Sequence, residues 1–193
     1  LSSSSAASDV YKRQYQDPAR GTCPSMTILE NMSMADNKGK PFNLMPCVNR
    51  KKTEEYRAML AQLGLGLEDK MGVPVGNLSG GQRQAMALLM STMTPIEFLI
   101  LDEHTAALDP ATAAKVLELS DKIVEENGLT ALMITHNMKD AIIHGNRLIM
   151  MNEGHIILDI SGEEKKKLTK KDLLDRFAAL AGQQEETDSV LLS

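Results

Sequence analysis

Residues 77–90, NLSGGQRQAMALLM, combine the residue types that hold an anion. Ser79 can cap a helix, and two glycines follow it directly. The first N–H groups of a helix have no partner within the helix, and the helix dipole adds roughly half a positive charge at that end. We therefore predict an anion site made by the Ser79 hydroxyl and the N–H groups of Gly80, Gly81 and Gln82. An ordinary capped helix with a flexible start is the alternative.

Two acidic residues follow a short apolar run later in the chain. Residues 96–103, IEFLILDE, are typical of a strand buried on both faces of a parallel sheet, with Asp102 and Glu103 at its carboxyl end. Ligand sites of α/β folds lie at that end of the strands. One carboxylate beside nucleotide phosphates can hold Mg²⁺, and its neighbour can activate a water molecule. A pair of solvated acids explains these two residues equally well when they are taken alone.

Two further polar residues are weaker candidates. His136 ends a second apolar run, TALMITH, where a histidine can contact a γ-phosphate, but lone histidines are more often structural. Gln16, in YQDPARGT, can serve as a neutral ligand of a metal ion or of water. The usual partner of such a site, a G-x-x-x-x-G-K-[ST] phosphate loop, does not occur in the sequence, since its one Gly-Lys pair, Gly39-Lys40, is followed by Pro41.

The elements that position these residues are helical in the first half of the chain. A capping box formed by Thr27 and Glu30 predicts a helix over residues 27–35. Thr53 is expected to cap the next helix, which Gly64 ends. The helix of the glycine segment has four apolar side chains on one face: Met86, Leu89, Met90 and Met93.

Strands and helices alternate in the second half. Pro110 begins a long helix that Asn127 and Gly128 end, and TALMITH is expected to be a buried strand. A short helix over NMKDAIIHG and a hairpin of RLIMM and HIILDI follow. A last helix is predicted from its apolar residues, which are Leu173, Leu174, Phe177 and Leu180. This alternation indicates an α/β fold with an inserted helical subdomain.

The composition is typical of a globular domain. The chain has 193 residues, of which 42% are hydrophobic and 24% charged, and its net charge of −5 disfavours a general nucleic-acid binder. No apolar stretch approaches the roughly 18 residues that a membrane helix needs. The two cysteines, Cys23 and Cys47, lack metal-ligand spacing and are interpreted as free thiols.

The beginning of the chain is interpreted as foreign to the protein. Residues 4–14, SSAASDVYKRQ, resemble the translation of a transposase sequencing adapter, and a disordered native tail is the alternative. The natural sequence would then begin near Tyr15, and we expect a phosphate loop, a base-stacking aromatic residue and the first strands upstream of it. The expected divisions are residues 1–14 as the adapter, 15–94 as the helical subdomain ending in the glycine-segment helix, 95–165 as the second half of the α/β core, and 166–193 as a last helix with a mobile tail.

Three motifs, LSGGQRQ, FLILDEHTAALD and MITHN, occur in this order and together resemble the ATP-binding subunit of ABC transporters. The resemblance extends from Tyr15 to at least Gly154. It implies an ABC-type P-loop NTPase fold whose phosphate loop and first strands are missing, with ATP and Mg²⁺ as cofactors. The segments LLDEHTAALDP, THNMKDAI and SGEEKK further resemble bacterial amino-acid uptake ATPases of the tryptophan/tyrosine type. Substrate choice, however, belongs to other subunits of such transporters.

The resemblance assigns the nucleotide contacts to the family's signature motif and D-loop. The implied cofactor-binding residues are Leu78, Ser79, Gly80, Gly81, Gln82 and Asp109. Ser79 and Gly81, in the signature motif (residues 78–82), would contact the γ-phosphate of ATP held by a second subunit. Asp109 would lie at the dimer interface within the D-loop, residues 107–109.

The resemblance also implies the catalytic and metal-binding residues. Asp102 would hold Mg²⁺, and Glu103 would be the general base for the attacking water. His136 would be the switch histidine. Gln16 would be the Q-loop residue that senses nucleotide, contributes to catalysis and to the metal site, and couples to the membrane partner. His104 stands where the family usually has proline, and we expect an altered turn there with activity intact and no metal site.

The implied partners are a second ATP-binding subunit in a homodimer, a transmembrane permease and an extracytoplasmic solute-binding protein, with no nucleic acid. The subunit would lie peripherally on the cytoplasmic face of the plasma membrane and energise import of a small solute such as an amino acid. A translation-type or DNA-repair-type ABC ATPase and a non-catalytic regulatory domain are the alternatives. We expect the 193-residue chain alone neither to bind ATP tightly nor to hydrolyse it.

Overall fold

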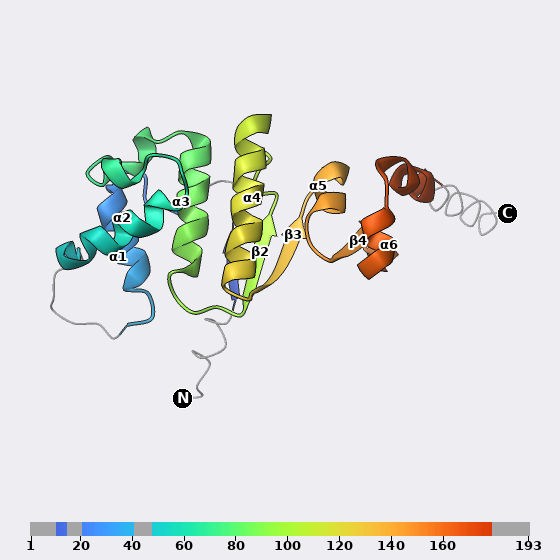
Figure 1. The fold of residues 1–193 in the computed structure, drawn as a ribbon, viewed down its shortest axis with the longest axis horizontal. Coiled ribbons are helices and arrows are strands. Elements are labelled where there is room, and N and C mark those ends of the chain that lie inside the picture. The colour runs from blue at the N-terminus through green and yellow to red at the C-terminus, as the bar shows by residue number, and fades with distance from the viewer. Residues whose placement is uncertain (1–10, 15–20, 41–47, 179–193) are drawn as a thin grey trace. The chain divides into compact units, whose positions relative to one another are not determined.

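The structure, a computed structural model, describes residues 11–14, 21–40 and 48–178, with the backbone alone described for residues 11–14 (Figure 1). The chain divides into two compact units, residues 1–134 and residues 135–193. The first unit holds a parallel sheet and a group of helices, whereas the second holds an antiparallel hairpin with its own helices.

Among the described residues, the sheet of the first unit has three parallel strands, in the order β1 (Tyr11–Gln14), β2 (Phe98–Asp102) and β3 (Thr130–Ile134). Helix α4 (Pro110–Glu126) connects β2 to β3 and lies alongside β2 in Figure 1. Parallel neighbours need such a crossover, because a tight turn joins only antiparallel strands. The predicted strand ending in two acids is therefore the central strand of the described sheet.

One face of β2 is better buried than the other. Helices α3 (Gly80–Thr92) and α4 cover this face, and the buried members of the resulting cluster are Leu88, Leu99, Leu101 and Ile123. Phe98 and Ile100, which alternate with the buried residues along the strand, are only half-buried. The prediction that both faces of β2 are buried is thus correct for one face.

Strand β3 is much more exposed than the sequence predicts. Leu132 and Ile134 are 44% and 43% exposed. Met133, which alternates with them, packs against the helix-covered cluster, so Leu132 and Ile134 lie on the opposite face of the sheet. No described strand or helix of the first unit covers them there. The apolar run alone could not reveal this, because it looks the same whether one face or both are covered.

Strand β1 lies within the segment that the sequence analysis set aside as an adapter. Its residues pair in register with β2, from Tyr11 opposite Phe98 to Gln14 opposite Leu101. A strand ladder is made by backbone groups and tolerates many sequences, so this pairing does not bear on where the segment comes from. The interpretation of residues 1–14 as an adapter stays a prediction.

The helices of the first unit enclose a second cluster. They are α1 (Ile28–Asp36), α2 (Thr53–Ala61) and α3, joined by the 3₁₀ helices η2 (Arg50–Lys52), η3 (Glu68–Lys70) and η4 (Val75–Asn77). The buried members are Ile28, Met32, Tyr56, Leu60, Leu67, Met71, Val75, Leu78, Met86 and Leu89. Met90 and Met93 pack against them, which confirms the apolar face predicted for α3.

Local hydrogen bonds explain how α1 and α2 begin. The Thr27 N–H donates to Glu30 Oε2 (2.7 Å) and the Glu30 N–H donates to Thr27 Oγ1 (3.3 Å), which confirms the predicted capping box. The prediction that Thr53 caps α2 is wrong. Helix α2 continues directly from η2, and both the N–H and the hydroxyl of Thr53 donate to the Arg50 carbonyl. Because the 3₁₀ turn already provides this partner, no side-chain cap is needed.

Asn31 of α1 holds the loop that precedes this helix. Its Oδ1 accepts the Cys23 N–H (2.7 Å), and its Nδ2 lies within hydrogen-bonding distance of the carbonyls of Cys23 (3.0 Å), Met26 (3.2 Å) and Thr27 (3.0 Å). Asn31 is fully buried, and a buried amide is stable only when it is hydrogen-bonded. These bonds therefore keep residues 23–27 in one conformation.

The second unit is built on the predicted hairpin. Strands β4 (Arg147–Asn152) and β5 (His155–Ser161) pair antiparallel. Glu153 and Gly154 form the connection with φ angles of 48° and 82°, as expected for a two-residue turn whose twist matches that of the strands.

Helical segments pack on this hairpin. They are α5 (Met138–Ile143), which was predicted, α6 (Gly162–Lys167), which was not, and residues 170–178. The buried members of their core are Leu148, Ile160, Leu168 and Leu173. The buried Lys165 ammonium group closes the end of α5 by donating, at 2.7, 2.8 and 3.0 Å, to the carbonyls of Ile142, His144 and Gly145. Leu180, expected in the last helix, lies outside the described residues.

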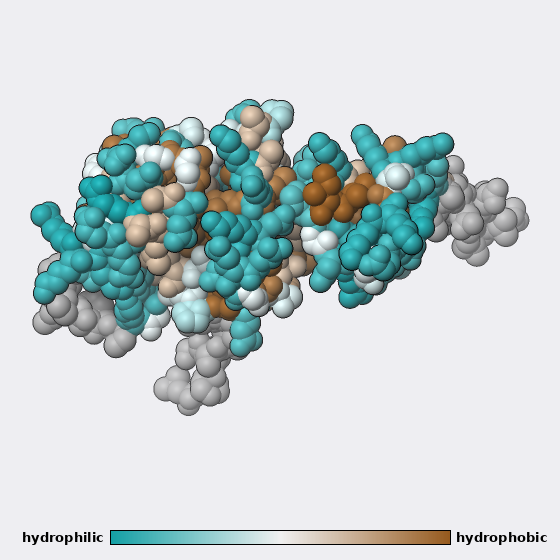
Figure 2. Space-filling view, viewed as in Figure 1, coloured by the Kyte–Doolittle hydropathy of each residue, from teal (hydrophilic) through white to brown (hydrophobic). Residues whose placement is uncertain are grey.

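The face of the molecule drawn in Figure 2 is largely hydrophilic, with hydrophobic areas on both units. The exposed large hydrophobic side chains are Met34, Leu132, Ile134, Ile143, Ile149, Met151, Ile156, Leu174 and Phe177. None of the helices in the described part of the chain has the length and apolar character that crossing a bilayer requires.

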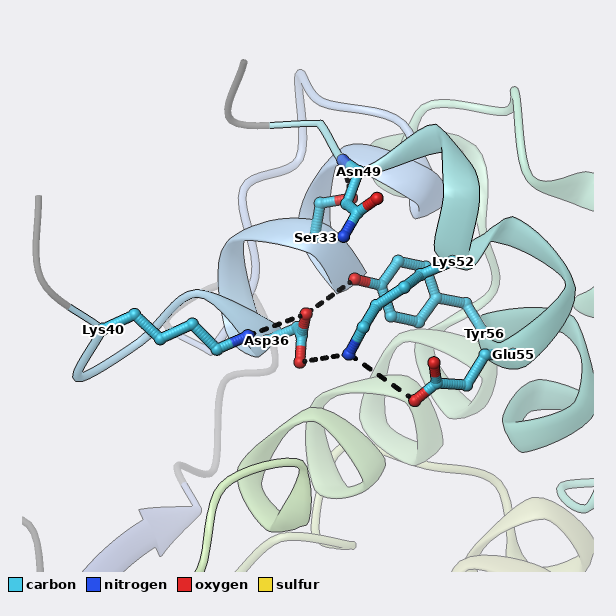
Figure 3. Close-up of polar contacts among 7 residues, drawn as sticks. All are labelled: Ser33, Asp36, Lys40, Asn49, Lys52, Glu55 and Tyr56. Carbon is cyan, nitrogen blue, oxygen red and sulfur yellow. Dashed lines mark hydrogen bonds and ion pairs between the residues drawn. The ribbon is translucent and has the colours of Figure 1, made fainter. Parts of the chain in front are cut away.

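A polar cluster at Asp36 joins the end of α1 to the start of α2 (Figure 3). The Asp36 carboxylate accepts hydrogen bonds from the Tyr56 hydroxyl (3.1 Å) and the Lys52 ammonium group (3.2 Å), and it pairs with Lys40 (3.1 Å). Lys52 also lies 3.7 Å from a carboxylate oxygen of Glu55. Beside this cluster, the Asn49 N–H donates to the Ser33 hydroxyl (3.2 Å). The two helices are thus joined by polar bonds as well as by their apolar core.

The cluster shifts two pKa values in opposite directions. Burial raises the pKa of Asp36, but hydrogen bonds from Lys40, Lys52 and Tyr56 outweigh burial and lower it. Burial and the neighbouring Asp36 carboxylate raise the pKa of Tyr56 to about 12. Asp36 is therefore ionised and Tyr56 neutral at pH 7, which is the combination that their hydrogen bond requires.

Replacing Asp36 by asparagine should lower the free energy of unfolding by about 1 kcal/mol at pH 7, mainly because the Tyr56 hydroxyl loses a charged acceptor. The more exposed ion pairs with lysine contribute less. Since folding lowers the pKa of Asp36, the carboxylate stabilises the fold above the ordinary aspartate pKa and loses this effect as the pH falls through the lowered value. Urea unfolding at several pH values should show the difference between wild type and Asp36→Asn shrinking in acid.

Asp69→Asn is the matched control, because Asp69 is exposed within η3. It should change the free energy of unfolding by less than about 0.5 kcal/mol. Equal losses in the two variants, or a difference that does not vary with pH, would contradict the role assigned to Asp36.

Candidate functional site

The glycine segment forms the capped start of α3. The Gln82 N–H donates to Ser79 Oγ (3.3 Å), and the Gln82 side-chain Oε1 accepts the Ser79 N–H (3.2 Å). This is a capping box, and it corrects one detail of the predicted anion site: the Gln82 N–H is used within the cap and does not point outward. The outward-facing donors are the N–H groups of Gly80 and Gly81, together with the proton of the Ser79 hydroxyl.

The far side of this cap is tied to the helical part of the unit. Gln82 Nε2 donates to the Leu65 carbonyl (3.1 Å). The side chain of Leu78 is buried in the core of α1, α2 and α3, although the resemblance placed this residue among the nucleotide contacts. Leu78 thus anchors the backbone of the segment by packing, and its side chain is not available to a ligand.

The two glycines allow α3 to approach α4 closely. A Cβ atom at Gly81 would lie 2.0 Å from Thr112 Cγ2, and one at Gly80 would lie 3.3 Å from Leu108 Cδ2. At the first distance, Thr112 or the backbone would have to shift, so packing favours glycine at position 81 whether or not an anion is present. The sequence indicated a ligand-binding reason for the two glycines, whereas this packing reason depends on a contact between residues far apart in the chain.

Asp109 begins α4 as its N-cap. Its Oδ1 accepts the Thr112 N–H (3.1 Å), and Pro110 occupies the first helical position, where a missing N–H does no harm. Hydrogen bonds from the side chain and the backbone N–H of Thr112 lower the pKa of Asp109. The carboxylate is therefore ionised at pH 7 and lies beside the contact between α3 and α4.

The carboxyl end of β2 carries the two predicted acids in a constrained turn. Asp102 is the last residue of the strand. Glu103 follows with a φ of 45°, a left-handed conformation that costs a non-glycine residue about 1 kcal/mol or more. The turn is held because the Glu103 N–H donates to the Ile134 carbonyl (2.9 Å) and the Glu103 carbonyl accepts the Ala106 N–H (3.0 Å). Both acidic side chains are partly exposed.

His104 anchors this turn from inside the protein. It is 2% exposed, and its Nε2 lies 3.1 Å from Ser120 Oγ of α4. The Ser120 hydroxyl donates its single hydrogen to the Val116 carbonyl (2.8 Å), so its oxygen accepts the hydrogen bond from the Nε2–H of His104. The histidine at the position where proline was expected is therefore a buried hydrogen-bonding residue, and this use of Nε2 was not visible in the sequence.

The remaining two predicted site residues are Gln16 and His136. Gln16 lies outside the described residues. His136 belongs to the second unit, where it is exposed and directly precedes Asn137, the N-cap of α5. Among the described residues, no group of three or more His, Cys, Asp or Glu side chains is arranged to hold a metal ion. A metal at Asp102 would accordingly need further ligands, such as phosphate oxygens and water, which is the usual situation for Mg²⁺.

Thr112 and Ser120 are the residues at this site that sequence reasoning missed. Thr112 had one local signal, its position three residues after an aspartate that precedes a proline, which marks it as the capped N–H of a helix. Its contact with Gly81 had none, because the two residues are far apart in the sequence.

Comparison with known proteins supports the motif-based interpretation. A family model described as ABC transporter matches residues 8–106. The tyrosine transport ATP-binding protein of Clostridioides difficile (strain R20291) is 48% identical over 168 residues, which cover 87% of this chain and 66% of that protein. The aliphatic sulfonates import ATP-binding protein SsuB of Cupriavidus pinatubonensis (strain JMP 134 / LMG 1197) is 35% identical over 136 residues, which cover 70% of this chain and 41% of that protein.

A solved structure has the same fold. The structure of cbiO1 from Clostridium perfringens, part of the ABC transporter complex cbiONQ, matches with a TM-score of 0.67 and 24% identity, covering 89% of this chain and 64% of that one. The predicted ABC-type fold is confirmed. The chain spans about two thirds or less of the length of these relatives.

The substitution Gly81→Ala should lower the free energy of unfolding by about 1–3 kcal/mol, because the added methyl group forces Thr112 or the backbone to move. Alanine is the better helix former by up to about 1 kcal/mol, so this clash must outweigh a favourable term. Chemical denaturation measures the difference. Gly72→Ala is the control, since a Cβ at Gly72 would meet nothing within 4 Å. A Gly81→Ala variant as stable as wild type would show that the approach of α3 to α4 is looser than described.

Proposed function

Because this chain belongs to the ABC transporter family, we propose that it is part of the ATP-binding subunit that powers such a transporter by hydrolysing ATP. The observation that carries this proposal is the constrained turn at the end of the central strand. There, Asp102 and Glu103 follow each other, and Glu103 is held in a left-handed conformation between the Ile134 carbonyl and the buried His104. Strain of this kind persists where the surroundings enforce it, which favours a functional reason for the turn.

The two acids take different roles in this proposal. Asp102 supplies an oxygen ligand of the type that Mg²⁺ prefers, and bound Mg²⁺ would neutralise charge on the phosphates. Glu103 accepts the proton of the attacking water. Its partial exposure supports this role, because a general base must be reachable by water. Gln16 and His136 complete the set as the nucleotide-sensing residue and as the residue that contacts the γ-phosphate.

The capped start of α3 serves a nucleotide held by a second copy of the subunit. The N–H groups of Gly80 and Gly81 and the Ser79 hydroxyl together donate to the γ-phosphate, and the helix dipole favours the negative charge. Asp109, beside them at the start of α4, contacts the partner copy at the dimer interface.

The transporter is an importer of an amino acid. The name of the relative from Clostridioides difficile, a tyrosine transport ATP-binding protein, supports this class of solute. The import protein SsuB, named for aliphatic sulfonates, shares less identity. In such an assembly the subunit binds a transmembrane permease at the cytoplasmic face of the plasma membrane, and an extracytoplasmic protein delivers the solute.

The substitution Glu103→Gln tests the proposed base. In the full-length ATPase it should lower kcat for ATP hydrolysis by about 10²–10⁴-fold, because the amide cannot accept the proton, while ATP binding is retained. Steady-state phosphate release and equilibrium nucleotide binding measure the two effects. Glu153→Gln is a closely matched control: Glu153 is also a glutamate with positive φ, but it lies in the exposed turn between β4 and β5. An unchanged kcat in Glu103→Gln, or an equal loss in both variants, would refute the assignment.

The 193-residue chain by itself should show no Glu103-dependent ATPase activity and should bind ATP weakly, since its sequence contains no phosphate loop. Phosphate release from the purified chain, compared with the same chain carrying Glu103→Gln, tests this. A wild-type rate above that of the variant would show that the chain hydrolyses ATP without the loop.

A further inference from the structure

We propose that Thr112 is a positioning residue that couples the start of α3 to the start of α4. Through this coupling, the signature motif (residues 78–82) and the D-loop (residues 107–109) move together. This inference rests on the proposed function, because it concerns how these two segments meet a nucleotide and a partner copy. Thr112 itself is not proposed to contact the nucleotide. It acts through Gly81 on one side and Asp109 on the other.

The contact with Gly81 is the first half of the coupling. The Thr112 Cγ2 methyl occupies the space where a side chain at Gly81 would be, at 2.0 Å from the ideal Cβ position. Gly81 is buried, so this methyl group forms part of its enclosure. Leu108 makes a parallel contact with Gly80, with its Cδ2 3.3 Å from the ideal Cβ position there. Residues on both sides of Asp109 in the sequence therefore pack on the glycine pair.

The bond to Asp109 is the second half. The Thr112 N–H donates to Asp109 Oδ1 (3.1 Å), which fixes the aspartate as the cap of α4. A single residue thus contacts the signature glycine with its methyl group, and the D-loop aspartate with both its backbone N–H and its hydroxyl. No flexible long side chain is involved, and a β-branched residue has few rotamers in a helix. A shift of the D-loop is therefore transmitted through Thr112 to the backbone of Gly81.

The start of α3 is also held on its other side, which makes the coupling directional. Gln82 is tied to the Leu65 carbonyl, and Leu78 is buried in the helical core. With these two anchors in place, the outward-facing N–H groups of Gly80 and Gly81 are positioned by the helical core on one side and by Thr112 on the other. Removing the methyl group of Thr112 frees only the second side.

Two substitutions at Thr112 separate its functional groups. Thr112→Ser removes the methyl group and keeps the hydroxyl, whereas Thr112→Val keeps a methyl group and removes the hydroxyl. In the full-length ATPase, ATP-driven dimerisation should weaken about tenfold in Thr112→Ser, an effect within the range of couplings between contacting residues. It should weaken less than about threefold in Thr112→Val, because this variant loses the hydrogen bond from the hydroxyl to Asp109 but keeps the backbone N–H bond to the same carboxylate. Binding of ADP to the separate subunit should stay unchanged in both. Analytical ultracentrifugation with ATP and titration with ADP give the two readouts.

The control is Thr130→Ser, which removes a methyl group from an exposed residue at the start of β3. It should leave dimerisation unchanged. The proposal would be overturned if Thr112→Ser dimerised as strongly as the wild type, or if Thr112→Ser and Thr112→Val weakened dimerisation equally. A parallel loss of ADP binding would also overturn it, because that result marks a general loss of structure and not a displaced signature motif.

A rescue experiment tests the contact independently of ATP. In the 193-residue chain, Gly81→Ala should be less destabilising when it is combined with Thr112→Ser, since the second change removes the atom with which the new methyl group collides. Additive effects on the free energy of unfolding would refute the contact. If the contact between Thr112 and Gly81 is verified but the Glu103→Gln variant hydrolyses ATP normally, the proposed function is wrong and the packing contact is still correct. If the contact is verified but Thr112→Ser does not weaken dimerisation, the proposed coupling is wrong.

Discussion

Helix α3 packs into both hydrophobic clusters of the first unit, and this double role constrains the elements around it. Met86 and Leu89 enter the cluster of α1 and α2, whereas Leu88 enters the cluster on β2. A helix held on two faces has little freedom to rotate or slide, because protein interiors are close-packed. The position of its first turn is therefore decided by packing, before any ligand is considered. Glycine at position 81 follows from this constraint, since α4 approaches the same turn.

The end of β2 depends on the same helix pair through α4. The buried His104 is bonded to Ser120 of α4, and the Glu103 N–H is bonded to β3, so the turn between them is held from two directions. Two anchors of this kind offset the cost of a left-handed glutamate. The result is a carboxylate that is partly exposed but attached to a rigid frame. A catalytic base in an ATPase needs this combination of access and fixed position.

Predictions that rested on neighbouring residues were the most accurate. The capping box at Thr27, the apolar face of α3 and the hairpin of β4 and β5 are formed by residues close in sequence, and all are as predicted. Predictions that depended on what lies nearby in space were less accurate. Strand β3 is exposed because the helices cover the other face of the sheet, and the Thr53 cap is replaced by a preceding 3₁₀ turn. The Gln82 N–H, assigned to an anion, is used by its own cap.

The amino-acid sequence alone determined the family and the candidate chemistry, because a signature motif, a strand ending in two acids and a following histidine are recognisable from residue types and spacing. The tertiary structure decided how these residues are held: by Thr112 against Gly81, by Ser120 bonded to His104, and by a left-handed turn at Glu103. Such contacts join residues that are distant along the chain. They leave no periodic trace in the sequence, since they exist only once packing has brought the helices and strands together.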